Sequence, residues 1–443
     1  MRPLKIWLLA LDFALWGTNP IGYHVTSSLW FVASVLLVHA ILRRALPGRP
    51  FLAFAGAWAV AVHPVFSEVV PFVTAREELM ATAFGLAALF AFLRSRVEGR
   101  SSVGFHAFYG LALLSKETAL TLLALPLAWD LTHGYLWPWS AARSRALLRT
   151  YLPSAAIVAV YFALRFMAFG NLFGGDGLPT HYLSPKELPS FHARFFRSLL
   201  DGTLFTAGRL PHVGVALAAL SAVAFAVLVR RWARIPSWRR RDLLFFGPLW
   251  YVGSTAILYG AYFATRHNLL PVIGLVIFVT LLGDVALQGG WIRREGRCAA
   301  AWLVISTLLF LPPTLVNGSD FRTASAAVKS IREGIEQRTA ATPPGSTIAL
   351  QGVPQWILPP YFFGWGLLSA LQLPFTRSDL AARSSVIDAR NITLTRAPVE
   401  LPEHYDLSIE IDSGGYATPE LEQRYLERLW RDGIVPRGQR RMP

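Results

Sequence analysis

The sequence predicts an all-α polytopic membrane bundle of about ten transmembrane helices, followed by a small extracytoplasmic α/β domain. Hydrophobic residues make up 53% of the 443-residue chain and charged residues only 16%, which is too apolar for one soluble domain. Apolar runs alternate with short arginine clusters, as in the cytoplasmic loops of membrane proteins. From Asn317 onward, charges of both signs replace the apolar runs. We therefore divide the chain into a transmembrane domain (residues 1–316) and an extracytoplasmic soluble domain (residues 317–443).

Charge and cysteine content exclude other classes. The net charge of +15 does not indicate nucleic-acid binding, because most of the positive charge falls in short loops between apolar runs. The single Cys298 excludes an intramolecular disulfide framework and a cysteine metal cluster. Membrane lipids are the expected surroundings, and the cytoplasmic (inner) membrane of a cell envelope is the expected location.

The predicted helices follow from the apolar runs in chain order. Residues 1–20 predict a helix at the membrane interface, because this stretch is too short and too interrupted to span. The predicted spans are residues 21–42, 51–66, 79–93, 105–131, 152–167, 213–229, 243–263, 269–287 and 299–315.

The run 105–131 is interrupted by Ser115-Lys116-Glu117-Thr118. Arginine clusters flank it on both sides, so it must cross twice or re-enter, with Lys116 and Glu117 at the outer apex. The count is then ten crossings with both termini outside. In the tail we expect a helix over 321–338, a strand over 347–353 and a last helix over 419–431.

One stretch, residues 63–79, is the most polar segment between two apolar runs. It holds His63, Glu68, Arg76, Glu77 and Glu78, and the topology places it on the same side of the membrane as Lys116. Ionisable groups at the edge of hydrocarbon are costly, so such a cluster is a candidate functional site.

Six short strings occur in order along the chain: RPL (2–4), NPIGYH (19–24), HPVFSEVVPFVTAREELMA (63–81), LLSKETALTL (113–122), YFALRF (161–166) and RHNLLP (266–271). Together they resemble the membrane half of GT-C glycosyltransferases, in particular the transmembrane O-mannosyltransferases that carry tetratricopeptide repeats. The resemblance covers residues 1–316.

The resemblance implies sugar transfer from a polyprenyl-phosphate carrier to an acceptor protein or glycan on the extracytoplasmic face. In this family, an acidic first outer loop precedes the RPL string. RPL begins here at residue 2, so we expect the first span and nearly all of that loop to be missing, with residues 1–20 as its remnant and Asp12 as the carboxylate left before the first span. A start codon set too late or a degenerate homologue would explain this. Two further departures are Arg76-Glu77-Glu78 in place of Arg-x-Asp and a tail without the repeats.

Transfer from a phosphate leaving group needs cations for the phosphate and a carboxylate for the acceptor proton or for a divalent metal ion. We assign catalytic roles to Glu68, Glu78 and Asp12, with Glu78 also the candidate ligand of a divalent metal ion. Lys116 is the first choice for the carrier phosphate. The full set of substrate-binding candidates is Lys116, Arg76, Arg165, Arg266, His63, His267 and Glu117.

Each assignment has a structural alternative. Glu78 also suits a helix N-terminus, arginines near a span extend to the interface, histidines cap turns, and Glu117 could serve only as the partner of Lys116. We expect Arg76 to be the partner of Glu68. For the whole chain, the alternative to an enzyme is a non-catalytic partner protein or lipid-linked-sugar binder. A transporter is disfavoured because no matched halves are visible.

Overall fold

The computed structural model divides the chain into two compact units, Met1–Leu315 and Val316–Pro443. The residues that it describes are 2–99, 102–135, 140–172, 186–193, 223, 226, 228–230, 232–256, 265–351, 370–372, 375–376, 380, 385–388 and 406–411.

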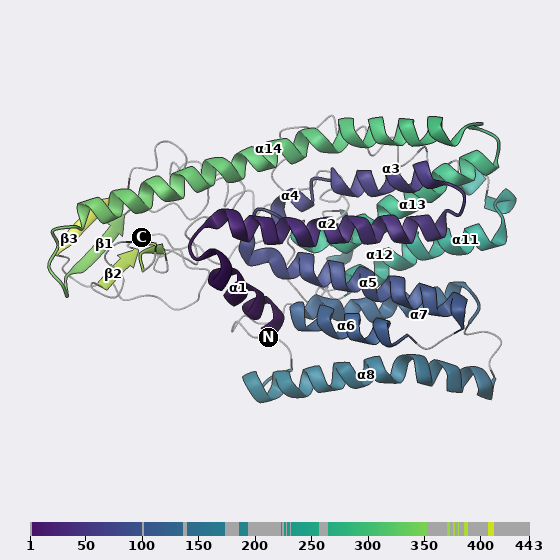
Figure 1. Ribbon diagram of the computed structural model, residues 1–443, viewed down its shortest axis with the longest axis horizontal. Coiled ribbons are helices and arrows are strands. Elements are labelled where there is room, and N and C mark those ends of the chain that lie inside the picture. Colours follow the sequence, from purple (N-terminus) through teal and green to yellow (C-terminus); the bar gives the residue numbers. More distant parts are fainter. Residues whose placement is uncertain are drawn as a thin grey trace. The chain divides into compact units, whose positions relative to one another are not determined.

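The first unit is helical (Figure 1). Its α-helices are α1 (Pro3–Trp16), α2 (Pro20–Ala45), α3 (Pro50–Ala61), α4 (Phe66–Val69), α5 (Arg76–Glu98), α6 (Val103–Ser115), α7 (Ala124–Thr132), α8 (Ala141–Phe169), α11 (Ser237–Leu244), α12 (Trp250–Thr255) and α13 (Leu269–Gln288), together with the start of α14 (Glu295–Arg338). Short 3₁₀-helical segments are η1 (Val73–Ala75), η2 (Glu117–Leu123), η4 (Trp232–Arg234) and η7 (Thr265–Asn268), and η5 (Phe245–Leu249) is a π-helical segment.

Five described helical segments are long and apolar enough to cross a membrane: Pro20–Ala45, Val73–Glu98, Ala141–Phe169, Arg266–Gln288 and Glu295–Arg338. Two shorter apolar helices are Pro50–Ala61 and Val103–Ser115. These helices coincide with predicted spans, while the total of ten crossings stays a prediction. Of the predicted spans, most of 213–229 and the last part of 243–263 lie outside the described residues.

Local signals explain where the helices begin and end. Pro20 starts α2, and the Asn19 side chain accepts a hydrogen bond from the Ile21 amide, a usual N-terminal arrangement. At the C-terminal end of α5, Gly99 takes a left-handed conformation with φ 65°, which glycine adopts at no steric cost.

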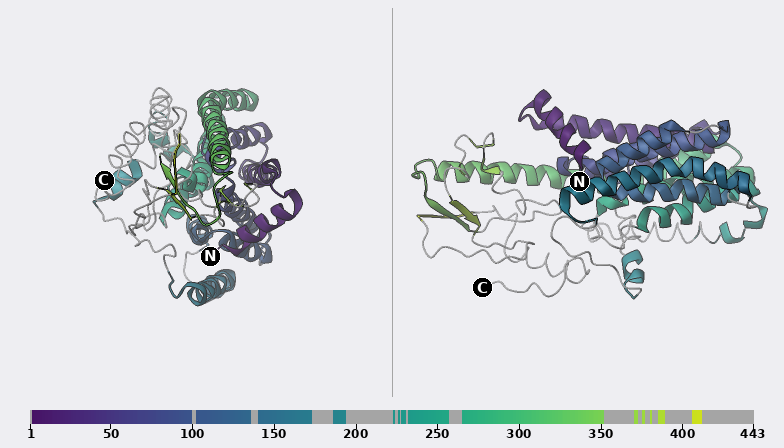
Figure 2. Two further views of the ribbon diagram at one scale, coloured as in Figure 1. Left: turned by 90° about the vertical axis from the view of Figure 1, so that its left-hand side faces the viewer. Right: turned by 90° about the horizontal axis from the view of Figure 1, so that it is seen from below.

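Of the described helices that are long enough to cross a membrane, α5 and α13 are the most buried, whereas most of α8 is exposed. Helix α8 lies at the edge of the unit in Figure 1 and in the left view of Figure 2. Small residues allow the close approaches. Gly56 of α3 faces Thr280 of α13, Gly85 of α5 faces Leu122, and Gly274 of α13 lies against the ring of the fully buried Trp250. The core is therefore built from interhelical contacts that leave no room for larger side chains.

One end of the first unit, which we call the arginine end, is fastened by buried or half-buried cations. Arg44 donates to the Leu93 carbonyl at 3.4 Å. Arg49 and Arg239 both reach Asp284, at 3.3 and 2.5 Å. These contacts bring together the loops and helix ends that carry the predicted cytoplasmic arginine clusters.

The interrupted run 105–131 turns back within the bundle, as its sequence predicted. It begins at the arginine end, where Phe105 packs on Phe92. Helix α6 ends at Ser115, and the backbone of the next residue, Lys116, is extended (φ −157°, ψ 140°). Lys116 lies beside the first turn of α5. The chain then returns through η2 and α7, and Asp130 pairs with Arg96 at the arginine end.

In the second unit, three short parallel strands pair in the order β2-β1-β3. They are β1 (Thr347–Gln351), β2 (Ser385–Asp388) and β3 (Leu407–Glu410). Ile331 and Ile335 of α14 form a small core with Ile348 and Leu350 of β1. The predicted strand and the α/β character are present, and the predicted helix over 419–431 lies outside the described residues.

The separation predicted between the last span (299–315) and the tail helix (321–338) was wrong, because α14 runs through both. Pro312 and Pro313 remove two backbone donors, and Thr314 Oγ1 donates to the Phe310 carbonyl at 2.8 Å within the same turn. A single helical glycine costs only about 1 kcal/mol, so Gly318 does not end the helix.

Gly274 provides a test of the central packing. Its substitution by alanine places a methyl group against the fully buried Trp250 ring, so we expect Gly274→Ala to destabilise the protein by about 1–3 kcal/mol. The matched control is Gly296→Ala in α14, where a Cβ meets nothing within 4 Å. Thermal unfolding in detergent, followed by tryptophan fluorescence, measures both, and equal melting temperatures would contradict the packing described.

Candidate active site

Five elements meet at the end of the first unit opposite the arginine end, which we call the acidic end. Helix α4 brings Glu68, the first turn of α5 brings Glu78, and the interruption after α6 brings Lys116. Turn η7 adds Arg266 and His267, and α1 adds its own N-terminal cations. The apex of the run 105–131 and the polar stretch 63–79 therefore lie side by side.

Glu78 forms the centre of this cluster. Lys116 Nζ donates to Glu78 Oε1, and His267 Nε2 lies 3.4 Å from the same oxygen. All three side chains are buried. A buried charge is tolerated when it is paired, so Glu78 and Lys116 hold each other in place, and Glu117 is not the partner of Lys116.

Glu68 is more loosely held. Its Oε1 lies 3.6 Å from Arg266 Nη1, and its side chain is 22% exposed, the most accessible carboxylate of residues 63–79. Burial raises the pKa of Glu68, while the positive charge of Arg266 opposes that rise. A carboxylate that is accessible, near a cation and shifted toward neutral pH is suited to accepting a proton.

The predicted pairing of Glu68 with Arg76 was wrong, because Arg76 turns the other way. Its Nη1 binds Asp12, its Nη2 donates to the Tyr23 carbonyl at 2.7 Å, and its Nε donates to Ser27 Oγ at 3.1 Å. Arg76 and Asp12 are both almost completely buried. The arginine fastens α5 to α1 and α2, a contact that requires the folded chain and could not be read from sequence spacing.

The predicted catalytic carboxylate Asp12 has both oxygens engaged. Oδ2 accepts from Arg76, and Oδ1 accepts from Thr26 Oγ1 at 2.8 Å. This geometry gives Asp12 a structural contact within the bundle rather than a free face toward a substrate.

The remaining predicted residues occupy less central positions. His63 Nδ1 accepts from the Val65 amide at 3.2 Å, so this histidine caps a turn, and its ring packs 4.5 Å from that of Phe310. Arg165 is buried on α8, with its guanidinium 5.6 Å from the centre of the Phe169 ring.

Sequence reasoning missed two cations at the N-terminal end of α1, Arg2 just before the helix and Lys5 within it. Arg2 donates from Nε and Nη2 to both oxygens of Glu117, at 3.1 and 2.6 Å, and from Nη1 to Glu77 at 2.9 Å. Lys5 Nζ lies 2.9 Å from Glu77 and donates to the Thr74 carbonyl at 2.7 Å. The RPL string was the available signal for Arg2, although the string alone gives the residue no partner.

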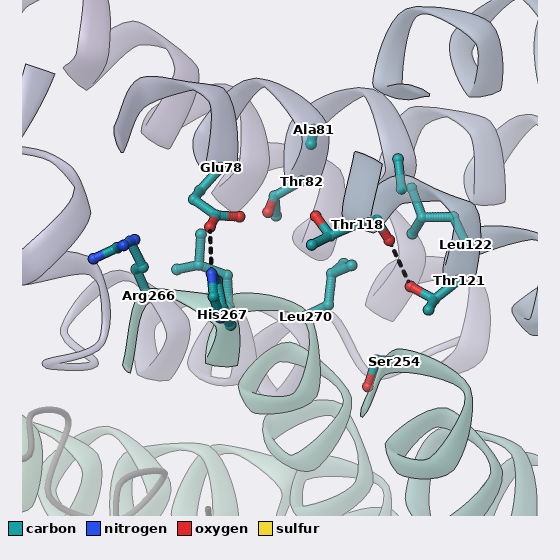
Figure 3. Close-up of a pocket in the computed structure, with 12 residues that line it drawn as sticks. Glu78, Ala81, Thr82, Thr118, Thr121, Leu122, Ser254, Arg266, His267 and Leu270 are labelled. Carbon is teal, nitrogen blue, oxygen red and sulfur yellow. Dashed lines mark hydrogen bonds and ion pairs between the residues drawn. The ribbon is translucent and has the colours of Figure 1, made fainter. Parts of the chain in front are cut away.

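A small pocket opens beside Glu78 (Figure 3). The side chains of Glu78 and His267 point toward one another at one end of it. Its free volume of about 20 Å³ is room for roughly one water molecule, so it fits the edge of a polar ligand rather than a whole sugar. The polar side chains that line it are Glu78, Thr82, Thr118, Thr121, Ser254, Arg266 and His267.

The donor set does not fit the divalent metal ion predicted at Glu78. Divalent cations bind several oxygen or nitrogen ligands together, and Glu78 faces the Lys116 ammonium instead. Within the described ranges, no group of three or more His, Cys, Asp or Glu side chains could hold a metal ion. The metal ion stays an expectation from the resemblance.

Substitutions in the Asp12–Arg76 pair test whether the Asp12 carboxylate has a structural or a catalytic role. Removing one charge of a buried pair leaves the other uncompensated, so we expect Asp12→Asn to cost about 3–5 kcal/mol of stability. The double variant Asp12→Leu/Arg76→Leu should recover most of this loss, since apolar replacements of buried pairs are often neutral. Thermal unfolding measures both. An Asp12→Asn protein of unchanged stability that has lost activity would instead make Asp12 catalytic.

Parts of known protein O-mannosyl-transferases are similar to this chain. One from Caenorhabditis elegans is 30% identical over 131 residues, covering 29% of this chain and 19% of the relative. Tmtc1 of Drosophila melanogaster is 32% identical over 126 residues, covering 28% of this chain and 15% of the relative. TMTC3 of Mus musculus is 25% identical over 155 residues, covering 33% and 17%.

The chain thus matches less than a fifth of the length of each of these relatives. No family model matches the chain, and no solved structure is significantly similar. The resemblance indicated by the motifs is confirmed at this level: the chain has apolar helices of membrane length and a distant, partial similarity to the TMTC protein O-mannosyl-transferases.

Proposed function

We propose that this protein is a membrane glycosyltransferase that transfers a sugar from a polyprenyl-phosphate carrier to an acceptor hydroxyl on the extracytoplasmic face. The observation that carries the proposal is the meeting of Lys116, Glu78 and His267 with Glu68 and Arg266 at one end of the bundle. The names of the relatives suggest mannose as the sugar and a protein as the acceptor.

The cations at the acidic end suit the leaving phosphate. Lys116 is a point charge at the interruption between α6 and η2, and Arg266 lies at the rim of the same pocket. In the proposed reaction the acceptor oxygen attacks the anomeric carbon, and the bond from that carbon to the phosphate oxygen breaks. The electron pair leaves with the phosphate, where fixed positive charges stabilise it.

Glu68 is the proposed proton acceptor. The proton of the acceptor hydroxyl passes to its carboxylate as the new bond forms, which is general-base catalysis. Glu78 is less suited to this step because Lys116 and His267 already occupy one of its oxygens. Its proposed role is to hold Lys116 and His267 in position.

A non-catalytic lipid-linked-sugar binder is the second candidate. It is favoured by one observation: Glu68, Glu77, Glu78 and Glu117 each face at least one cation in the folded chain. Such a protein would bind the carrier phosphate through the same cations and would not transfer the sugar. The two candidates therefore differ at Glu68 and agree at Lys116.

Lys116 is tested in a variant that keeps the fold. Lys116→Ala alone would leave Glu78 as an uncompensated buried charge, so we use Lys116→Met/Glu78→Gln, in which both members become neutral. We expect this protein to fold and to lose transfer by about 10²–10³-fold, the usual loss when a stabilising charge is removed. Transfer is measured as release of farnesyl phosphate from farnesyl-phosphate-linked mannose in the presence of membrane protein acceptors.

The control for the Lys116→Met/Glu78→Gln protein is Arg94→Ala, which removes an exposed ion pair at the arginine end. Unchanged transfer in the double variant would remove Lys116 from the site.

Glu68 is tested by the pH dependence of transfer. A general base works only when ionised, so the rate should fall as the pH drops through the pKa of Glu68. Because burial raises this pKa, the acid limb should lie above the 4.5 usual for a glutamate. Glu68→Gln should reduce transfer by about 10²–10⁴-fold and abolish the limb while farnesyl phosphate still binds. Glu98→Gln, at the exposed pair with Arg94, is the control. Transfer with an unshifted limb in Glu68→Gln would exclude Glu68 as the base.

A further inference from the structure

Helix α1 supplies two cations that the acidic end would otherwise lack. Arg2 donates hydrogen bonds to both oxygens of Glu117 and to one oxygen of Glu77, and Lys5 forms an ion pair with the other oxygen of Glu77. The Arg2–Glu117 contact joins residues 115 positions apart and has the planar two-bond geometry in which arginine binds carboxylates most strongly.

The cluster is close to charge balance only with these two cations. Its carboxylates are Glu68, Glu77, Glu78 and Glu117, and its permanent cations are Lys116, Arg266, Arg2 and Lys5. Without α1, two carboxylates would be uncompensated beside Lys116. A site with surplus negative charge repels an anion such as a phosphate.

Arg2 also acts on the segment that carries Lys116. Glu117 follows Lys116 directly, at the start of η2. Burial would raise the pKa of Glu117, but the hydrogen bonds and charge of Arg2 lower it to about 2. Glu117 is therefore ionised at neutral pH and depends on Arg2 for its compensation, and the Arg2 contact fixes the chain where Lys116 turns toward Glu78.

We infer that Arg2 is a positioning residue for the anionic donor: by neutralising Glu117 and Glu77, it allows Lys116 and Arg266 to bind the carrier phosphate without touching that phosphate itself. This inference rests on the proposed function, since it takes the donor head group to be a phosphate ester. It assigns Arg2, the residue that precedes α1, a role in donor affinity.

The test is a double-mutant cycle on binding. The full chain is placed in lipid nanodiscs, and the dissociation constants of farnesyl phosphate and of uncharged farnesol are measured by tryptophan fluorescence. The variants are Arg2→Gln, Glu117→Gln and the double variant Arg2→Gln/Glu117→Gln. We expect Arg2→Gln to weaken farnesyl phosphate binding by about tenfold or more, with farnesol binding unchanged. The double variant should return to within about threefold of the natural sequence, because it restores the charge balance.

The possible binding results distinguish a failure of the Arg2 inference from a failure of the proposed function. Loss in Arg2→Gln with recovery in the double variant supports positioning through Glu117. No loss in Arg2→Gln overturns the inference and leaves the proposed function intact. Loss without recovery in the double variant also overturns the inference, because Arg2 would then touch the phosphate itself or support folding generally. The melting temperatures of the four proteins distinguish these two explanations. If the natural sequence binds farnesol and farnesyl phosphate equally weakly, the proposed function fails and the inference falls with it.

Discussion

The structure of the first unit depends on one constraint: charges placed among apolar helices must find partners within the protein. Lys116 and Glu78 are the clearest case. They are 38 positions apart and both buried, so α6 has to end where α5 begins. That requirement fixes the interruption between α6 and η2, and it brings His267 of η7 onto the same carboxylate.

The same constraint operates at both ends of the unit with different results. At the arginine end, Asp284 accepts from Arg239 and from Gln288 of its own helix, and these groups hold helices together. At the acidic end, the paired groups border a pocket, and Glu68 and Arg266 keep part of their surface exposed. A pair that is buried among protein groups is a structural contact, whereas a pair with accessible atoms near a pocket can act on a ligand.

Much of this arrangement could be predicted from sequence, because hydropathy and the placement of arginines depend on short-range pattern. They predicted the main helices, the interruption at Lys116, and the common side of Lys116 and Glu68. The choice of partners could not be predicted, since Arg76 could reach several carboxylates and only the packing of α1 on α2 selects Asp12. The long α14 was missed for the opposite reason: the change in composition at residue 317 does not change its backbone.

The distribution of partners also explains why one carboxylate remains available for chemistry. A general base has to gain a proton without breaking a contact that the fold requires. Asp12 gives both oxygens to Thr26 and Arg76, and Glu78 is bound to Lys116. In each of these, protonation would leave a buried cation without compensation, at a cost of several kcal/mol. Glu68 faces a more distant arginine, and both side chains keep part of their surface exposed, so solvent can compensate Arg266 when Glu68 is protonated. The accessible member of the cluster is thus the one that can change its charge during a reaction cycle while the bundle keeps its packing.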